Sequence, residues 1–118
     1  MAFRDLSGAV DFSYLEVYTQ NDAGVIEEVL NLFSQQADIW SPLLDVSHAG
    51  WRDAAHTLKG AASGIGARAL AEVAEAAEKG DDAGAERRLI KVRDALDAAV
   101  LDVAAYLHGL RLKGLRGG

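Results

Sequence analysis

The chain has 118 residues, is half hydrophobic, carries a net charge of −6 and contains no cysteine. Its length is enough for one domain with one hydrophobic core. The negative charge argues against a general nucleic-acid binder, and the lack of cysteine excludes disulfides, thiol catalysis and cysteine-based metal sites. No apolar run approaches the roughly 20 residues of a membrane span, and no apolar stretch typical of a signal peptide follows the charged N-terminus. We therefore expect a soluble, cytoplasmic protein that binds neither membranes nor nucleic acids.

The first half of the chain predicts a short helix and then a long one. Residues 1–10 are expected to form a loose lead-in. Asp11 is suited to cap the short helix and Asp22 the long one, because a side-chain oxygen at this position accepts a free backbone N–H. Pro42 should end or kink the long helix. Apolar residues at steps of three and four give that helix one buried face: Val25, Ile26, Val29, Leu30, Phe33, Ala37 and Trp40.

The second half predicts three further helices, over residues 51–66, over residues 67–79 and from about residue 83 onward. The last helix has a nearly heptad apolar repeat and is expected to fray from Arg111 into a basic, flexible tail that reaches residue 118. Short turns separate all these helices. The sequence therefore predicts an all-α fold, an antiparallel four-helix bundle with an additional short N-terminal helix, as a single domain over residues 1–118.

One histidine lies on the outer face of the predicted helix 51–66. At about 100° per residue, His56 is about 160° from Leu58, which marks the inner face. Lys59 and Gly60 are its neighbours at i+3 and i+4. Glycine inside a helix costs about 1 kcal/mol relative to alanine, which suggests that the missing side chain has a use. Imidazole can carry a covalent group, and phosphoryl transfer needs positioning and charge neutralisation. An incidental surface histidine is the plainer interpretation of the same pattern.

Two other kinds of site are disfavoured. The pair Asp53 and His56 has the spacing of half a di-iron motif, but it has no matching second pair and points away from the core. The glycines in residues 60–66 lack the Lys-Ser/Thr ending of a nucleotide-binding loop and follow no strand. His48 and His108 are interpreted as surface residues without a role. We therefore expect neither a metal nor a nucleotide in this chain.

The stretch around the histidine resembles the signature of histidine-containing phosphotransfer (HPt) domains. It reads Ala55-His-Thr-Leu-Lys-Gly-Ala-Ala-Ser-Gly-Ile-Gly-Ala-Arg-Ala-Leu70. The lead-in, the amphipathic second helix and the long terminal helix are also similar to those of the family, so that the resemblance covers roughly residues 10–110. It implies a helical bundle that acts as a phosphorelay intermediate. Such a protein accepts a phosphoryl group on a surface histidine and passes it to or from an aspartate of a response-regulator receiver domain.

The resemblance also implies roles for individual residues. His56 would be the phosphoacceptor, through Nε2, and Lys59 would neutralise the phosphoryl charge. Gly60 would leave room for the phosphoryl group and the partner. Glu78, which is 22 residues after the histidine, would accept a hydrogen bond from Nδ1 and orient the ring. Ser63 would bind a phosphate oxygen or the partner, although it is equally well explained as a small surface residue.

The partners implied are a receiver domain and a sensor or hybrid histidine kinase. The Mg²⁺ that the transfer needs would be held by the receiver, so this chain would need no cofactor and would have no ATP-dependent kinase activity of its own. Arg52 and Arg68 flank the motif and either bind an acidic rim of a partner or are ordinary exposed arginines. The alternative function is a non-catalytic adaptor or dimerisation module. The heptad-like last helix leaves homodimerisation open, and we do not predict it.

Overall fold

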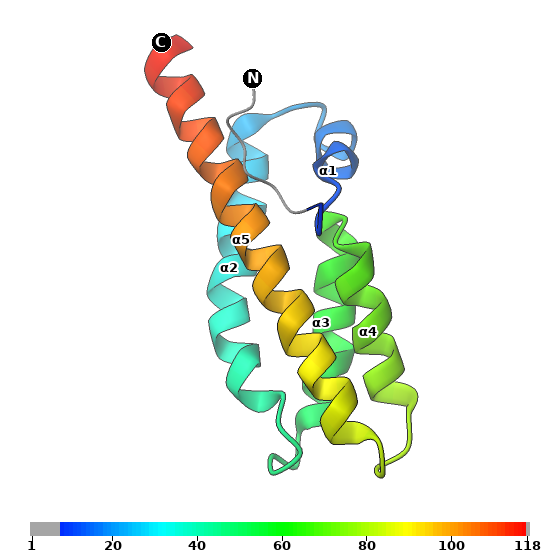
Figure 1. Ribbon diagram of the computed structural model, residues 1–118. Helices are drawn as coiled ribbons and strands as arrows, with labels where there is room; N and C mark the ends of the chain where they lie inside the picture. The colour runs from blue at the N-terminus through cyan, green and yellow to red at the C-terminus, as the bar shows by residue number, and fades with distance from the viewer. Residues whose placement is uncertain (1–7, 118) are drawn as a thin grey trace.

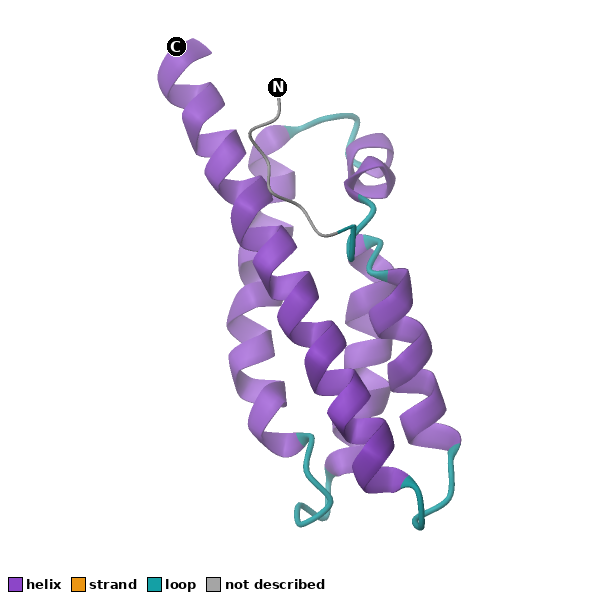
Figure 2. Ribbon diagram, in the orientation of Figure 1, coloured by secondary structure: helices purple, strands orange, loops and turns teal. Residues whose placement is uncertain are grey.

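The computed structural model describes the backbone of residues 8–117 and the side chains through residue 114. Its helices run antiparallel in chain order, with the short α1 placed across one end of the bundle (Figures 1 and 2). This arrangement confirms the predicted all-α bundle with an additional N-terminal helix. The elements are α1 (Phe12–Tyr18), α2 (Ala23–Trp40), the 3-10 helix η1 (Ser41–Leu43), α3 (Trp51–Ile65), α4 (Arg68–Lys79) and α5 (Ala85–Gly117).

Local sequence signals explain where the first helices begin and end. The Asp11 side chain accepts a hydrogen bond from the backbone N–H of Ser13, and the Asp22 side chain accepts one from Val25, each at 3.1 Å. Both predicted caps are therefore present. Pro42 lies in the 3-10 turn that follows α2, so the proline ends the helix and does not kink it.

The turn between α3 and α4 depends on a glycine. Gly66 has a φ of +85°, in the left-handed region that favours glycine. Its N–H donates to the carbonyl of Ser63, and the N–H of Ala67 donates to the carbonyl of Ala62, which together form a Schellman motif. The Gly66 carbonyl accepts the N–H of Asp11 at 2.9 Å. The same turn therefore ends α3 and fixes the entry to α1.

The core is built from the inner faces of all the helices. Leu58 and Ala62 of α3 have no exposed surface, which agrees with the predicted inner face of that helix. Leucines of the other elements fill the space around them, and those that are at least 99% buried are Leu30, Leu44, Leu70, Leu89 and Leu96. Since a buried leucine stabilises the fold by about 2 kcal/mol, this cluster fixes the frame from which the outer face of α3 projects.

Two predictions about the chain ends need correction. α5 continues as a helix to Gly117, so the fraying expected from Arg111 is wrong for the described residues, and residue 118 of the predicted tail lies outside them. Leu107 is buried and Leu110 packs against the core, which anchors the helix up to this point, and no proline interrupts the residues beyond it. At the other end Val10 is buried and its N–H donates to the Asp102 carboxylate at 3.2 Å, so this part of the lead-in is not loose. The rest of the predicted lead-in, residues 1–7, lies outside the described residues.

Among the described residues, no helix is both long and apolar enough to cross a membrane.

Candidate functional site

His56 projects from the outer face of α3. Its side chain is 64% exposed, while Ala55 and Leu58 on the opposite face are completely buried. Gly60, one turn further along, is exposed, and a Cβ built on it would meet nothing within 4 Å. The imidazole therefore lies beside an open surface that another molecule can reach.

Glu78 of α4 holds one side of this imidazole. Its Oε2 lies 2.8 Å from Nδ1 of His56, which is the hydrogen bond that the family resemblance implies. A carboxylate can only accept, so the neutral ring carries its proton on Nδ1 and leaves the lone pair of Nε2 available. Only 24% of the Glu78 side chain is exposed, because α4 packs closely along α3. The contact therefore fixes both the tautomer and the direction of the ring.

Lys59 adds a positive charge to this pair. Its Nζ lies 3.7 Å from Oε1 of Glu78, and Oε1 is buried with no hydrogen bond of its own among the described residues. The ammonium group is thus the nearest opposite charge to that oxygen, and it lies on the same helix face as His56. The fold brings together His56, Lys59, Gly60 and Glu78, all of which were predicted as site residues.

A second ion pair lies beside the site. Lys79 Nζ is 2.7 Å from Oε2 of Glu75, and this hydrogen bond lowers the pKa of the Glu75 carboxyl and raises the pKa of the Lys79 ammonium. The charge of Lys59 lowers the pKa of Glu75 further. Both members of the pair are therefore charged at neutral pH.

Two comparisons with known proteins agree with this geometry. The family model described as Hpt domain matches residues 15–102, which is most of the chain. The crystal structure of histidine phosphotransferase ShpA from Caulobacter crescentus is 55% identical in sequence, with a TM-score of 0.81 over 92% of this chain and 99% of that chain. The chain belongs to the Hpt family. No curated protein matches it closely enough to add a relative. Membership gives the chain a histidine phosphotransfer role in a phosphorelay.

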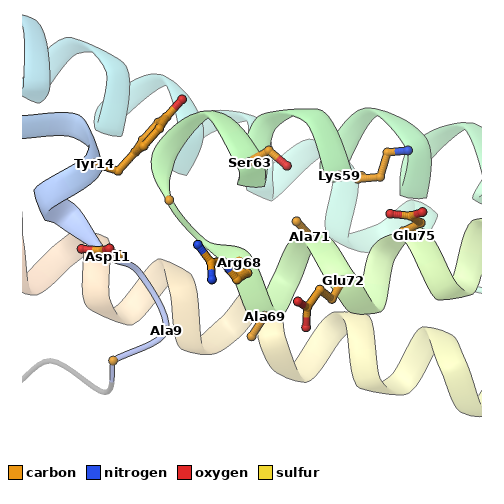
Figure 3. A pocket seen from close by; sticks show the side chains of 12 residues that line it. Ala9, Asp11, Tyr14, Lys59, Ser63, Arg68, Ala69, Ala71, Glu72 and Glu75 are labelled. Carbon is orange, nitrogen blue, oxygen red and sulfur yellow. The ribbon is translucent and has the colours of Figure 1, made fainter. Parts of the chain in front are cut away.

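The two arginines that were predicted to meet a partner differ in their surroundings within the Hpt domain. Arg52 is engaged inside the molecule: it donates to the backbone carbonyl of Glu78 and to Oδ1 of Asp82, the latter at 2.7 Å. Arg68 is exposed at the start of α4. It lies on a groove of about 770 Å³ that also touches Lys59 and Ser63 (Figure 3). The partner-binding roles of both arginines stay predictions.

Among the described residues, the remaining candidates form no hydrogen bond or ion pair with the imidazole. His48 and His108 are exposed, in the connection before α3 and on α5, and Asp53 is exposed in the first turn of α3. Within the part of the chain that the structure describes, no three His, Asp or Glu side chains gather in a way that could hold a metal ion.

Sequence reasoning missed two features of the Hpt surface. Tyr14 and Asp11 of the α1 region line the groove beside Lys59, because α1 lies across the end of α3 and α4. Helical periodicity gives the face of a helix but not the helix that it meets, so no signal in the sequence placed these residues. The inward contacts of Arg52 were missed for the same reason.

Proposed function

We propose that this chain is a phosphorelay intermediate in which Nε2 of His56 accepts a phosphoryl group from an aspartyl phosphate of a response-regulator receiver domain or from a sensor or hybrid histidine kinase. The group then passes to the aspartate of another receiver. The observation that carries the proposal is the exposed imidazole whose Nδ1 is bound by Glu78 at 2.8 Å. This contact leaves Nε2 as the nucleophilic nitrogen.

The chemistry follows from this arrangement. The lone pair of Nε2 attacks phosphorus, the P–O bond of the aspartyl phosphate breaks, and the aspartate leaves as a carboxylate. The proton on Nδ1 stays in place, so the phosphorylated ring carries a positive charge that the Glu78 carboxylate stabilises. No proton has to leave the ring at any step. The same contact serves the reverse transfer, because the barrier is crossed through the same geometry.

The neighbouring residues supply charge and space. The Lys59 ammonium neutralises the incoming phosphoryl oxygens, which is a large part of what a phosphoryl-transfer site must provide. The lack of a side chain at Gly60 admits the phosphoryl group and the rim of the receiver. Ser63 is exposed nearby and would donate to a phosphate oxygen or to the partner. The Mg²⁺ needed would be bound by the acidic pocket of the receiver, and the chain would have no ATP-dependent kinase activity of its own.

A transfer assay with two histidine variants tests this proposal. The protein is incubated with radiolabelled ATP and an active hybrid kinase, or with a phosphorylated receiver domain. We expect acid-labile, base-stable label on the wild type and on the control His48→Gln, and none on His56→Gln. Equal labelling of His56→Gln would refute the assignment. If no kinase or receiver of a complete cognate set labels the wild type, the adaptor function replaces it.

A further inference from the structure

Arg52 connects α3 to the end of α4 at the residue that holds His56. Its Nη1 donates to the backbone carbonyl of Glu78 and its Nη2 donates to Asp82 Oδ1 at 2.7 Å. The guanidinium carbon also lies 4.4 Å from the ring centroid of Trp51, itself a mostly buried residue. Stacking on a fixed ring and binding two acceptors together set the plane of the guanidinium group.

The carbonyl that Arg52 binds is one that the helix leaves without a partner. α4 ends at Lys79, so the carbonyls of its last turn have no amide four residues further along the helix. The N–H of Gly80 already donates to Ala76, and the chain turns into an extended conformation at Gly80. Arg52 therefore provides a donor to the main chain of Glu78, while the side chain of Glu78 binds His56. The main chain and the side chain of one residue are thus held by two residues of α3 that are one turn apart.

We propose that Arg52 is a positioning residue that keeps the end of α4 in register with α3, so that the Glu78 carboxylate stays on Nδ1 of His56. Its effect on transfer rests on the proposed function, but its effect on the imidazole does not. The hydrophobic contribution to the packing of the two helices is not directional. A hydrogen bond that joins the helices beside the site is directional, and it limits how far Glu78 can slide or rotate.

This proposal differs from a role for Arg52 at the partner surface. The Arg52 side chain is 40% exposed, but its two terminal nitrogens already have acceptors within the chain. A lysine at this position would keep the positive charge but could not span both acceptors with a planar fork. The two explanations therefore predict different results for Arg52→Lys. A positioning role is weakened by this change, whereas a purely electrostatic role at the surface is kept.

The direct measurement is the tautomer of His56 by ¹⁵N NMR. His48 and His108 are exposed, so replacing both by Gln leaves one imidazole to observe. At about two pH units above the ordinary imidazole pKa of about 6.5, we expect the wild type to hold its proton mainly on Nδ1. Arg52→Met keeps a long apolar side chain next to Trp51 and removes the donors. We expect the tautomer ratio to move about fivefold toward Nε2–H, with a similar loss in the rate of phosphoryl uptake. Arg52→Lys should fall between the two.

Two controls separate the possible causes. Arg87→Met removes an exposed arginine of α5 and should change neither quantity. Glu78→Ala sets the full size of the tautomer change. An unchanged tautomer in both Arg52 variants would overturn the proposal, and so would slower uptake with an unchanged tautomer, which would assign Arg52 to the partner surface. If Arg52→Met does not fold, Arg52→Lys decides in the same way. A tautomer shift in a protein that no partner phosphorylates would refute the proposed function and leave the positioning role standing.

Discussion

The two ends of the α3–α4 hairpin are constructed differently. At the end that α1 covers, Gly66 takes a left-handed conformation and Ile65, Ala67 and Leu70 are almost fully buried. At the opposite end, charged side chains bind the main chain: Arg52 donates to the Glu78 carbonyl, and Arg88 of α5 donates to the carbonyl of Asp81 in the following turn. His56 is in the second turn of α3, and so it lies toward the polar end.

The buried end of the hairpin mainly contributes stability, whereas the polar end mainly orients the side chains of the site. Burial of apolar surface contributes about 25 cal/mol per Å², but it has no preferred direction. Hydrogen bonds and ion pairs at an exposed surface contribute only about 1 kcal/mol or less, but they fix angles and distances. Substitutions at the buried end should therefore lower the free energy of unfolding, while the geometry of His56 in the folded molecules stays unchanged. Substitutions on the polar side should change the phosphoryl-transfer reaction and leave the fold intact.

The largest effect is expected from Gly66→Val. A β-branched residue is strained at a φ of +85°, and a Cβ at this position would lie 2.5 Å from the carbonyl oxygen of Asp11. We expect the free energy of unfolding to fall by about 3 kcal/mol, measured by urea denaturation. The His56 tautomer of the folded fraction should stay unchanged. The control is Gly64→Ala, where a Cβ meets nothing within 4 Å, and which should stabilise the helix slightly. Full stability of Gly66→Val would remove the distinction between the two ends.

A smaller but still large effect is expected from Gly60→Gln, this time on transfer. The free protein has open space at Gly60, so the substitution should not lower its stability. In a complex with a receiver, the added side chain occupies the space that the phosphoryl group and the partner need. We expect uptake of the phosphoryl group to fall about 100-fold, or about 2.7 kcal/mol in the barrier. Gly114→Gln on α5, where a Cβ also has open space, is the matched control. Normal uptake by Gly60→Gln would show that this gap has no use.

The sequence predicts the faces and the starts of helices better than the contacts between helices. Apolar spacing gives the inner face of α3, and the capping residues Asp11 and Asp22 mark where helices begin, because these signals act within a few residues of the chain. The helical conformation of α5 beyond Arg111 was not predicted. Packing of Leu107 and Leu110 anchors the helix up to that point, and the exposed residues 111–113 that follow are Arg, Leu and Lys, which favour helix.

The site shows the same difference between contacts within one helix and contacts between helices. The positions of His56, Lys59 and Gly60 relative to one another follow from the geometry of one helix. The approach of Glu78 came only from the family resemblance, because it depends on how α4 packs on α3. Arg52 was assigned to the surface because its spacing places it on the outer side of α3, while its length lets it reach the end of the next helix. Sequence spacing alone predicts least about the contacts of long polar side chains, because one Cα position permits many contacts.

The smallest of these effects is expected from Lys59→Ala. This variant tests whether Lys59 acts through its charge or by orienting Glu78. The Lys59 ammonium lies 3.7 Å from Oε1 of Glu78, whereas the imidazole is held by Oε2. Removing it should therefore leave the tautomer of His56 unchanged, and alanine suits the helix. We expect phosphoryl uptake to slow about tenfold, since one positive charge is lost where three phosphoryl oxygens arrive. Stopped-flow or quench assays measure the rate, with Lys91→Ala on α5 as the control and Lys59→Arg as a partial rescue. An unchanged rate would contradict the electrostatic role, and a changed tautomer would show that Lys59 acts by holding Glu78.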